Sequence, residues 1–248
     1  MLKTTRRPLA GFTLIELLTV IAIIGILASI IIPSVGAVRI SAQKAAERAN
    51  LGTIGKSATI YATDNSDYLP DPLSKSGQSL NASGGLFKWM LLLARAGTLT
   101  GPSFYFSKID QPQYQCRVED LPGTIYNPTN HLALATGIGT FTPNVELVGG
   151  LKTDYLPTTP IAFIRGLRTD GQWDKDQGVY GESGGAIVFL GGNVQQYTSI
   201  DSKLTRPSGK PTNNILETIP YPPGGNQRVY GKNAKIGTEG GTKPQLAN

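Results

Sequence analysis

Residues 12–32 read FTLIELLTVIAIIGILASIII and carry a single charged side chain, that of Glu16. As a helix this stretch would be about 31 Å long, close to the thickness of the hydrocarbon core of a bilayer. Lys3, Arg6 and Arg7 precede it, and positive residues favour the cytoplasmic side of a membrane. The stretch therefore predicts one membrane-spanning helix, with a short cytoplasmic leader before it and the rest of the chain exported.

An ordinary secretory signal peptide is the alternative interpretation of the same stretch. Such a signal needs a small-x-small cleavage site after its apolar region. Ala28-Ser29 fits that pattern poorly, and Pro33 follows closely. A signal peptide also has no use for a carboxylate inside its apolar region, so the sequence favours a retained anchor.

Glu16 is the informative residue of the anchor. An ionised carboxylate in hydrocarbon costs several kcal/mol, so it has to be neutralised or paired. A cut between Gly11 and Phe12 would create an α-amino group four residues before Glu16, with an ordinary pKa of about 7.7–8. Between helices shifted along a bundle axis, this amine and the carboxylate of another copy could pair and fix the register of the copies. We therefore expect self-association through the N-terminal helices.

The sequence GFTLIEL, which begins at Gly11, resembles the processing motif of type IV prepilins and of type II secretion pseudopilins. The resemblance implies that a prepilin peptidase cuts after Gly11 and N-methylates Phe12. It makes Glu16 the fifth residue of the mature chain, as in the family. Gly25 and Pro33 stand where the family has its helix-loosening glycine and proline, so the resemblance implies assembly roles for these two residues.

The same resemblance implies the location and the fold. We expect a single-pass protein of a bacterial inner membrane, with a cytoplasmic N-terminus, a periplasmic head, and inner-membrane secretion or pilus assembly proteins as partners. The expected fold is α+β, a long N-terminal helix packed on a small antiparallel sheet. The segment IYATDNSDYLPD, residues 60–71, is similar to the corresponding part of major pseudopilins, apart from the inserted Leu69. A lone Cys116 excludes the internal disulfide of major pilins, which also favours a pseudopilin.

Composition, together with the prolines and glycines that interrupt helices and strands, divides the chain into five segments. After a leader at 1–11 and the membrane and assembly helix at 12–33, we expect an amphipathic stem helix at 34–64. An α+β head at 65–204 and a Pro/Gly-rich basic tail of loops or disorder at 205–248 complete the chain. The stem should pack through a small-residue face in which apolar residues recur at three- and four-residue steps: Val35, Val38, Ala42, Ala45, Ala49 and Ala58.

Within the head, local patterns predict a few elements. Residues 86–96 predict a short buried helix that Gly97 ends. Residues 104–106, 132–135 and 161–164 predict strands, and residues 186–190 and 194–197 predict a hairpin around Gly191-Gly192-Asn193.

Charge and composition narrow the function classes. The net charge is +6, but residues 33–204 hold 14 basic and 14 acidic side chains. The positive excess therefore lies outside the expected head, and we expect no specific binding of nucleic acid. With one His and one Cys, a zinc or redox centre is not expected, and no cofactor is required.

Two motifs could hold further chemistry. Asp170, Asp174 and Asp176 lie in a glycine-containing loop whose oxygens suit calcium, and major pseudopilins carry a calcium site in a C-terminal loop. The spacing is not that of an EF-hand, so a solvated loop is the alternative. The other motif, GESGG around Ser183, resembles a serine-protease signature, but His131 lacks the surroundings of a protease histidine. We expect a glycine turn and no catalysis.

The favoured function is therefore structural: a subunit of a pilus-like filament, the pseudopilus of a type II secretion system. A type IV pilin or minor pilin for adhesion, motility or DNA uptake is the close alternative. A membrane-tethered binding module whose head acts alone is the third possibility.

Overall fold

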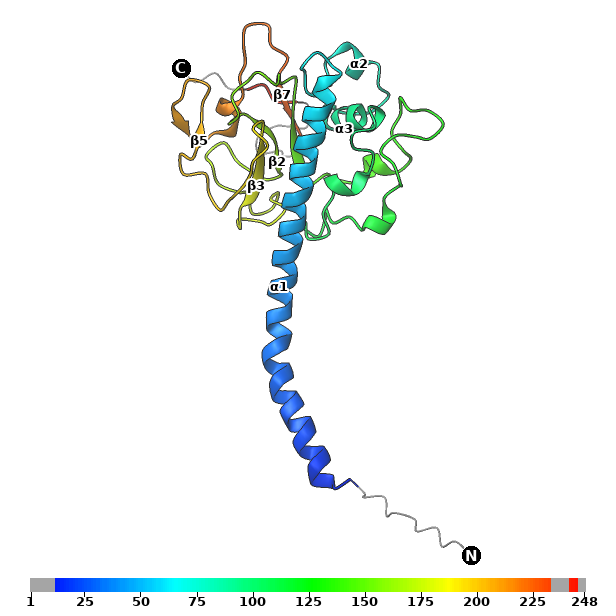
Figure 1. Cartoon of the computed structure of the whole chain (residues 1–248), viewed down its shortest axis with the longest axis vertical. Coiled ribbons are helices and arrows are strands. Elements are labelled where there is room, and N and C mark those ends of the chain that lie inside the picture. Colours follow the sequence, from blue (N-terminus) through cyan, green and yellow to red (C-terminus); the bar gives the residue numbers. More distant parts are fainter. Residues whose placement is uncertain (1–11, 233–240, 245–248) are drawn as a thin grey trace, which may run out of the picture. The chain divides into compact units, whose positions relative to one another are not determined.

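The computed structural model describes residues 12–232 and 241–244. The chain forms two compact units, Met1–Lys44 and Ala45–Asn248. Helix α1, Leu14–Thr63, begins in the first unit and continues in the second (Figure 1). The predicted leader at 1–11 and part of the predicted tail lie outside the described residues.

The second unit combines short helices with a sheet. Its remaining α-helices are α2 (Lys75–Gln78) and α3 (Gly85–Arg95). Its strands are β1 (Val145–Gly149), β2 (Pro160–Ile164), β3 (Gly185–Phe189), β4 (Val194–Tyr197), β5 (Leu204–Thr205), β6 (Pro211–Thr212) and β7 (Arg228–Tyr230). Four 3-10 helices lie between them: η1 (Pro102–Tyr105), η2 (Val118–Asp120), η3 (Ile138–Thr140) and η4 (Ile215–Thr218).

The main sheet is antiparallel and has the strand order β4-β3-β2-β1-β7. Every residue of β1, β2 and β3 is buried, because both faces of the sheet are covered. The expected α+β architecture is confirmed. The predicted strand at 161–164 is confirmed as β2, and the predicted hairpin as β3 and β4.

The part of α1 that belongs to the second unit packs closely on β3. Leu51, Ile54 and Ala58 have no exposed surface. A Cβ added to Gly55 would lie 2.6 Å from a methyl group of Val188, so the helix backbone approaches the strand more closely than any side chain there would allow. The helix thus supplies one wall of the hydrophobic core.

The small-residue face predicted for the stem is only partly the buried face: Ala58 is fully buried, but the other predicted positions are not. Ala45 and Ala49 are exposed, as are Val35 and Val38. The buried positions follow a different phase of the helix, on which Gly55 makes the closest contact with the sheet. The prediction failed at the exposed positions because it counted alanines as the small residues and left the glycines out.

Helix α3 confirms the predicted buried helix. Most of its side chains are buried, and the indole N–H of Trp89 donates to the carbonyl oxygen of Val148 in β1 at 3.0 Å. After the helix, Gly97 adopts a left-handed conformation with φ of 74°. Glycine adopts this conformation without strain, which is why it ends the helix.

Other predictions within the head need correction. The predicted strand at 104–106 falls at the end of the 3-10 helix Pro102–Tyr105. The one predicted at 132–135 forms only isolated bridges. Both runs were too short for periodicity to separate a strand from a turn. Strand β1 was not predicted, because its sequence VELVG is short and carries Glu146, although Pro143-Asn144 directly before it is a turn signal.

The prediction that residues from Thr205 onward are loops or disorder is also corrected. Strand β7 joins the main sheet beside β1, with Val148 opposite Val229. The side chains of Ile215 and Tyr230 are buried in the core. The frequent prolines and glycines of this segment made its few apolar residues hard to recognise as core residues. Residues 204–232 therefore belong to the folded unit.

A buried polar cluster joins α1 to two loops of the second unit. Glu47 of α1 is 8% exposed, and its carboxylate accepts hydrogen bonds from the hydroxyls of Ser107 and Tyr180. Nearby, the fully buried Arg165 pairs with Asp110. Burial raises the pKa of Glu47, and the charge of Asp110 acts in the same direction. Ionising Glu47 in place is therefore unfavourable.

This cluster predicts how stability depends on pH. Because the folded state holds the Glu47 proton more tightly than the unfolded chain does, stability should fall as pH rises from 4.5, its ordinary pKa, through the raised value. Glu47→Gln keeps the size of the side chain and removes the titration. The melting temperature of the full chain in nanodiscs should decline with pH by several degrees in the wild type and by less in this variant.

The matched control is Glu119→Gln, because the Glu119 side chain is 70% exposed. The melting temperature of Glu119→Gln should decline with pH as in the wild type. Equal declines for wild type and Glu47→Gln would contradict the assigned role of Glu47.

Candidate functional site

The first half of α1 is apolar and uncovered. Residues Leu14–Ile32 have a mean hydropathy of 2.8, and none of this segment is buried within the described structure. Exposure of its large apolar side chains ranges from 47% at Val20 to 81% at Leu14. By length and composition this helix can cross a membrane, and water would be an unfavourable environment for it.

Glu16 caps the helix to which it belongs. The N–H and the hydroxyl of Thr13 both donate to Glu16 Oε2, at 2.8 and 2.7 Å. In return, the N–H of Glu16 donates to Thr13 Oγ1 at 3.3 Å. This reciprocal arrangement is a capping box, in which residues three apart satisfy backbone groups that have no partner at the start of a helix.

The capping box changes what Glu16 can do. One carboxylate oxygen is occupied by Thr13 of the same chain. Across the described residues, no hydrogen bond reaches the other oxygen, Oε1, which can accept one from outside. The two roles are compatible because a carboxylate has several acceptor sites. The spacing T-x-x-E is visible in the sequence and was the signal that sequence reasoning missed.

The other residues predicted for processing and assembly make no distinctive contact in the described part of this chain. A Cβ added to Gly25 would have no atom within 4 Å, and helix α1 continues through Pro33 without a break. Phe12 is 78% exposed at the beginning of the described chain, and Gly11 lies outside it. Processing at Gly11 and Phe12, and assembly roles for Gly25 and Pro33, stay predictions.

The three aspartates proposed for calcium are not gathered into one group. Asp170 forms an ion pair of 2.6 Å with Arg168. One oxygen of Asp174 accepts from the backbone N–H groups of Asp176 and Gln177, at 3.0 and 2.9 Å. Among the described residues, no group of three or more His, Cys, Asp or Glu side chains is placed to hold a metal ion. Calcium binding by this loop stays a prediction.

The glycine-rich motif around Ser183 and the lone histidine are not joined. His131 packs against the ring of Tyr126, with centroids 4.6 Å apart. In the described parts of the chain, no hydrogen bond connects His131 with Ser183. Gly184, which follows, has φ of 89° and passes close to the backbone of Tyr197, so a glycine is needed there for structural reasons.

Comparison with known proteins bears on the same N-terminal helix. Residues 6–32 match the model of the prokaryotic N-terminal methylation motif. The chain thus carries, at its N-terminus, a sequence that is similar to this motif. It is also similar to the type IV wide pilus major component PilA4 of Thermus thermophilus, with 47% identity over 62 residues. The similarity covers 25% of this chain and 47% of that protein, so this chain spans less than half of the relative's length. No solved structure matches the chain.

The calcium prediction can be tested on the full chain. Binding through Asp170, Asp174 and Asp176 predicts that millimolar calcium raises the melting temperature of chelator-treated protein, because a ligand that binds only the folded state stabilises it. Asp176→Asn should reduce the rise, and Asp201→Asn, outside this loop, should leave it unchanged. The absence of any rise would contradict the prediction.

Proposed function

We propose that the chain is cut after Gly11, is methylated at Phe12, and polymerises through its N-terminal helix into a pilus-like filament. The observation that carries this proposal is a carboxylate, that of Glu16, in an uncovered apolar helix. A partner for Oε1 and a cover for the apolar surface are both needed, and neighbouring copies of the helix would supply both.

A freed α-amino group at Phe12 is the complementary partner. It is mostly cationic near neutral pH, and in the hydrocarbon each of the two charges is unfavourable without the other. Thr13 already holds one side of the carboxylate, which would orient the other oxygen toward the amine of the next copy. Prepilin peptidase and inner-membrane assembly proteins are the partners that this proposal requires.

We further propose that the filament serves type II secretion as a pseudopilus. The segment after α1, with its Asp-Asn and Tyr-Leu-Pro sequence, supports this choice. So does the lone Cys116, which is buried and free. A filament of this kind acts as a moving rod or plug and needs no active site of its own.

A type IV pilus is the second candidate. It is supported by the similarity to PilA4, which is a pilus component in Thermus thermophilus. That similarity covers only a quarter of this chain and does not extend over most of the head. Deleting the gene for this chain distinguishes the two candidates. Loss of protein export with surface pili retained supports the pseudopilus. Loss of pili with export retained supports the pilus.

The N-terminus of the native protein tests the processing step. Mass spectrometry should find a chain that begins at Phe12 and carries one added methyl group. The matched control is Gly11→Val, which should retain the leader because a branched side chain replaces the glycine at the cleavage site. A wild-type chain that begins at Met1, or one that is cut near residue 30, would remove the basis for the filament.

The assembly step is tested by Glu16→Ala. The variant should insert in the membrane normally, but filament yield should fall by about a hundredfold or more, because removing one partner of a buried pair costs roughly 3 kcal/mol or more. The measurement is the amount of sheared or sedimented filament relative to the total amount of the chain.

Thr19→Ala is the control for the assembly test. The Thr19 hydroxyl lies one turn further along the helix and donates only to the carbonyl oxygen of Glu16, at 3.0 Å. Filament yield should therefore be retained. Wild-type yield in Glu16→Ala would contradict the charge pairing.

A further inference from the structure

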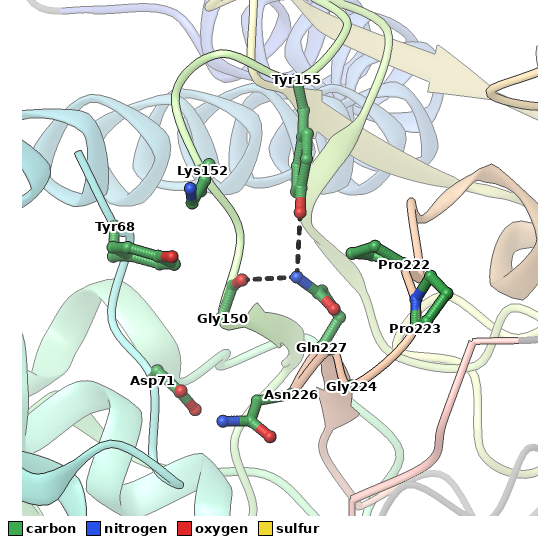
Figure 2. A pocket seen from close by; sticks show the side chains of 11 residues that line it. Tyr68, Asp71, Gly150, Lys152, Tyr155, Pro222, Pro223, Gly224, Asn226 and Gln227 are labelled. Atoms are coloured by element: carbon green, nitrogen blue, oxygen red, sulfur yellow. Dashed lines mark hydrogen bonds between the residues drawn. The ribbon is translucent and has the colours of Figure 1, made fainter.

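An open cleft lies in the second unit, beside the turn that follows α1. It consists of two adjoining cavities of about 270 and 430 Å³, and Tyr68, Asp71 and Asn226 border both of them. Figure 2 shows the first cavity, with side chains converging from the segment after β1 and from the loop before β7. The larger volume lies within the range of pockets that bind small molecules, and the smaller lies just below it.

The cleft offers an aromatic surface that is held in position. Tyr68 as a whole residue is 42% exposed, and the ammonium group of Lys152 lies 4.8 Å from the centroid of its ring. A backbone bridge between the same two residues fixes the segment that carries the ring. Pro222 and Pro223 add apolar surface on the opposite side of the cavity (Figure 2). A ligand with an apolar face can lie against these groups.

Asp71 provides a carboxylate for hydrogen-bond donors. Its Oδ1 accepts from the N–H of Leu73 at 2.8 Å, and partial burial raises its pKa, although Arg228 acts in the other direction. Within the described part of the chain, Asp71 forms no ion pair. Figure 2 shows the amide of Asn226 in the same space. A hydroxyl group of a ligand could donate to Asp71 and accept from Asn226.

Gln227 is held with its amide fixed. Its Nε2 donates to the carbonyl oxygen of Gly150 at 2.9 Å and to the hydroxyl oxygen of Tyr155 at 3.1 Å (Figure 2). The hydroxyl hydrogen of Tyr155 is therefore left to donate to a ligand. Gln227 is 4% exposed, and its Oε1 has no partner among the described residues. A buried acceptor without a partner is unfavourable, and such atoms occur where a bound molecule or water completes the site.

Charge decides the class of ligand. Lys152, which lines the cleft, disfavours a cation, and Asp71 disfavours an anion. The remaining polar groups call for a neutral molecule that both donates and accepts hydrogen bonds and has an apolar face. The rings of sugars combine these properties. An extended peptide would instead pair with a strand edge, but the outer side of β7 already pairs at Val229 with Thr242.

We propose that this cleft binds a neutral saccharide, with a sugar ring against Tyr68 and its hydroxyl groups bonded to Asp71 and Asn226. This site is separate from the N-terminal helix and does not depend on filament formation. It would give the head a recognition function in addition to assembly.

The test uses the full chain in phospholipid nanodiscs, since many detergents carry sugar headgroups. The probes are linear tetrasaccharides of glucose, N-acetylglucosamine, mannose and galactose, with binding followed by saturation-transfer NMR. At least one should bind saturably. Tyr68→Ala and Asp71→Asn should each weaken binding by about tenfold or more, because stacking and a charge-assisted hydrogen bond are lost.

Asp154→Asn is the matched control, because Asp154 is exposed in the same segment and does not line the cleft. Its affinity should equal that of the wild type. If Tyr68→Ala lowers the melting temperature, its loss of binding could come from unfolding. Asp71→Asn then decides the test, because the asparagine keeps an oxygen that can accept from the N–H of Leu73 and so preserves the local fold. The proposal is overturned if no neutral tetrasaccharide binds, if binding is the same in Asp71→Asn, or if only tetragalacturonate or a neutral hexapeptide binds.

Discussion

The contact between Gly55 of α1 and Val188 of β3 sets the position of everything else in the second unit. A Cβ at this glycine would come within 2.6 Å of a valine methyl group, so the helix can approach the sheet only because the side chain is missing. Leu51, Ile54 and Ala58 are fully buried around this point. The burial of these side chains, rather than helix propensity, stabilises this half of a very long helix.

Nearer its N-terminus, the same helix is not covered by the chain's own sheet. There the side chains are as apolar as in the core but remain uncovered, and a carboxylate lies among them. Thr13 satisfies part of that carboxylate and, through the capping box, starts the helix. One continuous helix therefore carries two different surfaces: one packs on the chain's own sheet, and the other has the length and composition of a membrane-spanning helix.

The sequence predicted those elements whose pattern lies within a short stretch of the chain. The anchor, helix α3 and the β3–β4 hairpin were predicted because long apolar runs and glycine turns are local patterns. Strand β1 was missed because its short sequence carries Glu146. Strand β7 was missed because it is only three residues long and pairs with β1, which lies far earlier in the chain. The buried face of α1 was predicted only at Ala58, because the close contact is made by Gly55, and a glycine adds nothing to a hydrophobic pattern. The cleft around Tyr68 brings together residues more than 150 positions apart, which no local pattern reveals.

The bridge between Val229 and Thr242 has a consequence for how this chain associates. Strand β7 is the last strand of the main sheet, and its outer side would otherwise present unpaired backbone groups to any passing strand. At the other margin, β4 is short and has two exposed glutamines. If copies gather at high local density in a membrane, as proposed above, both margins of the sheet would disfavour sheet-to-sheet aggregation and leave ordered contacts to the helix.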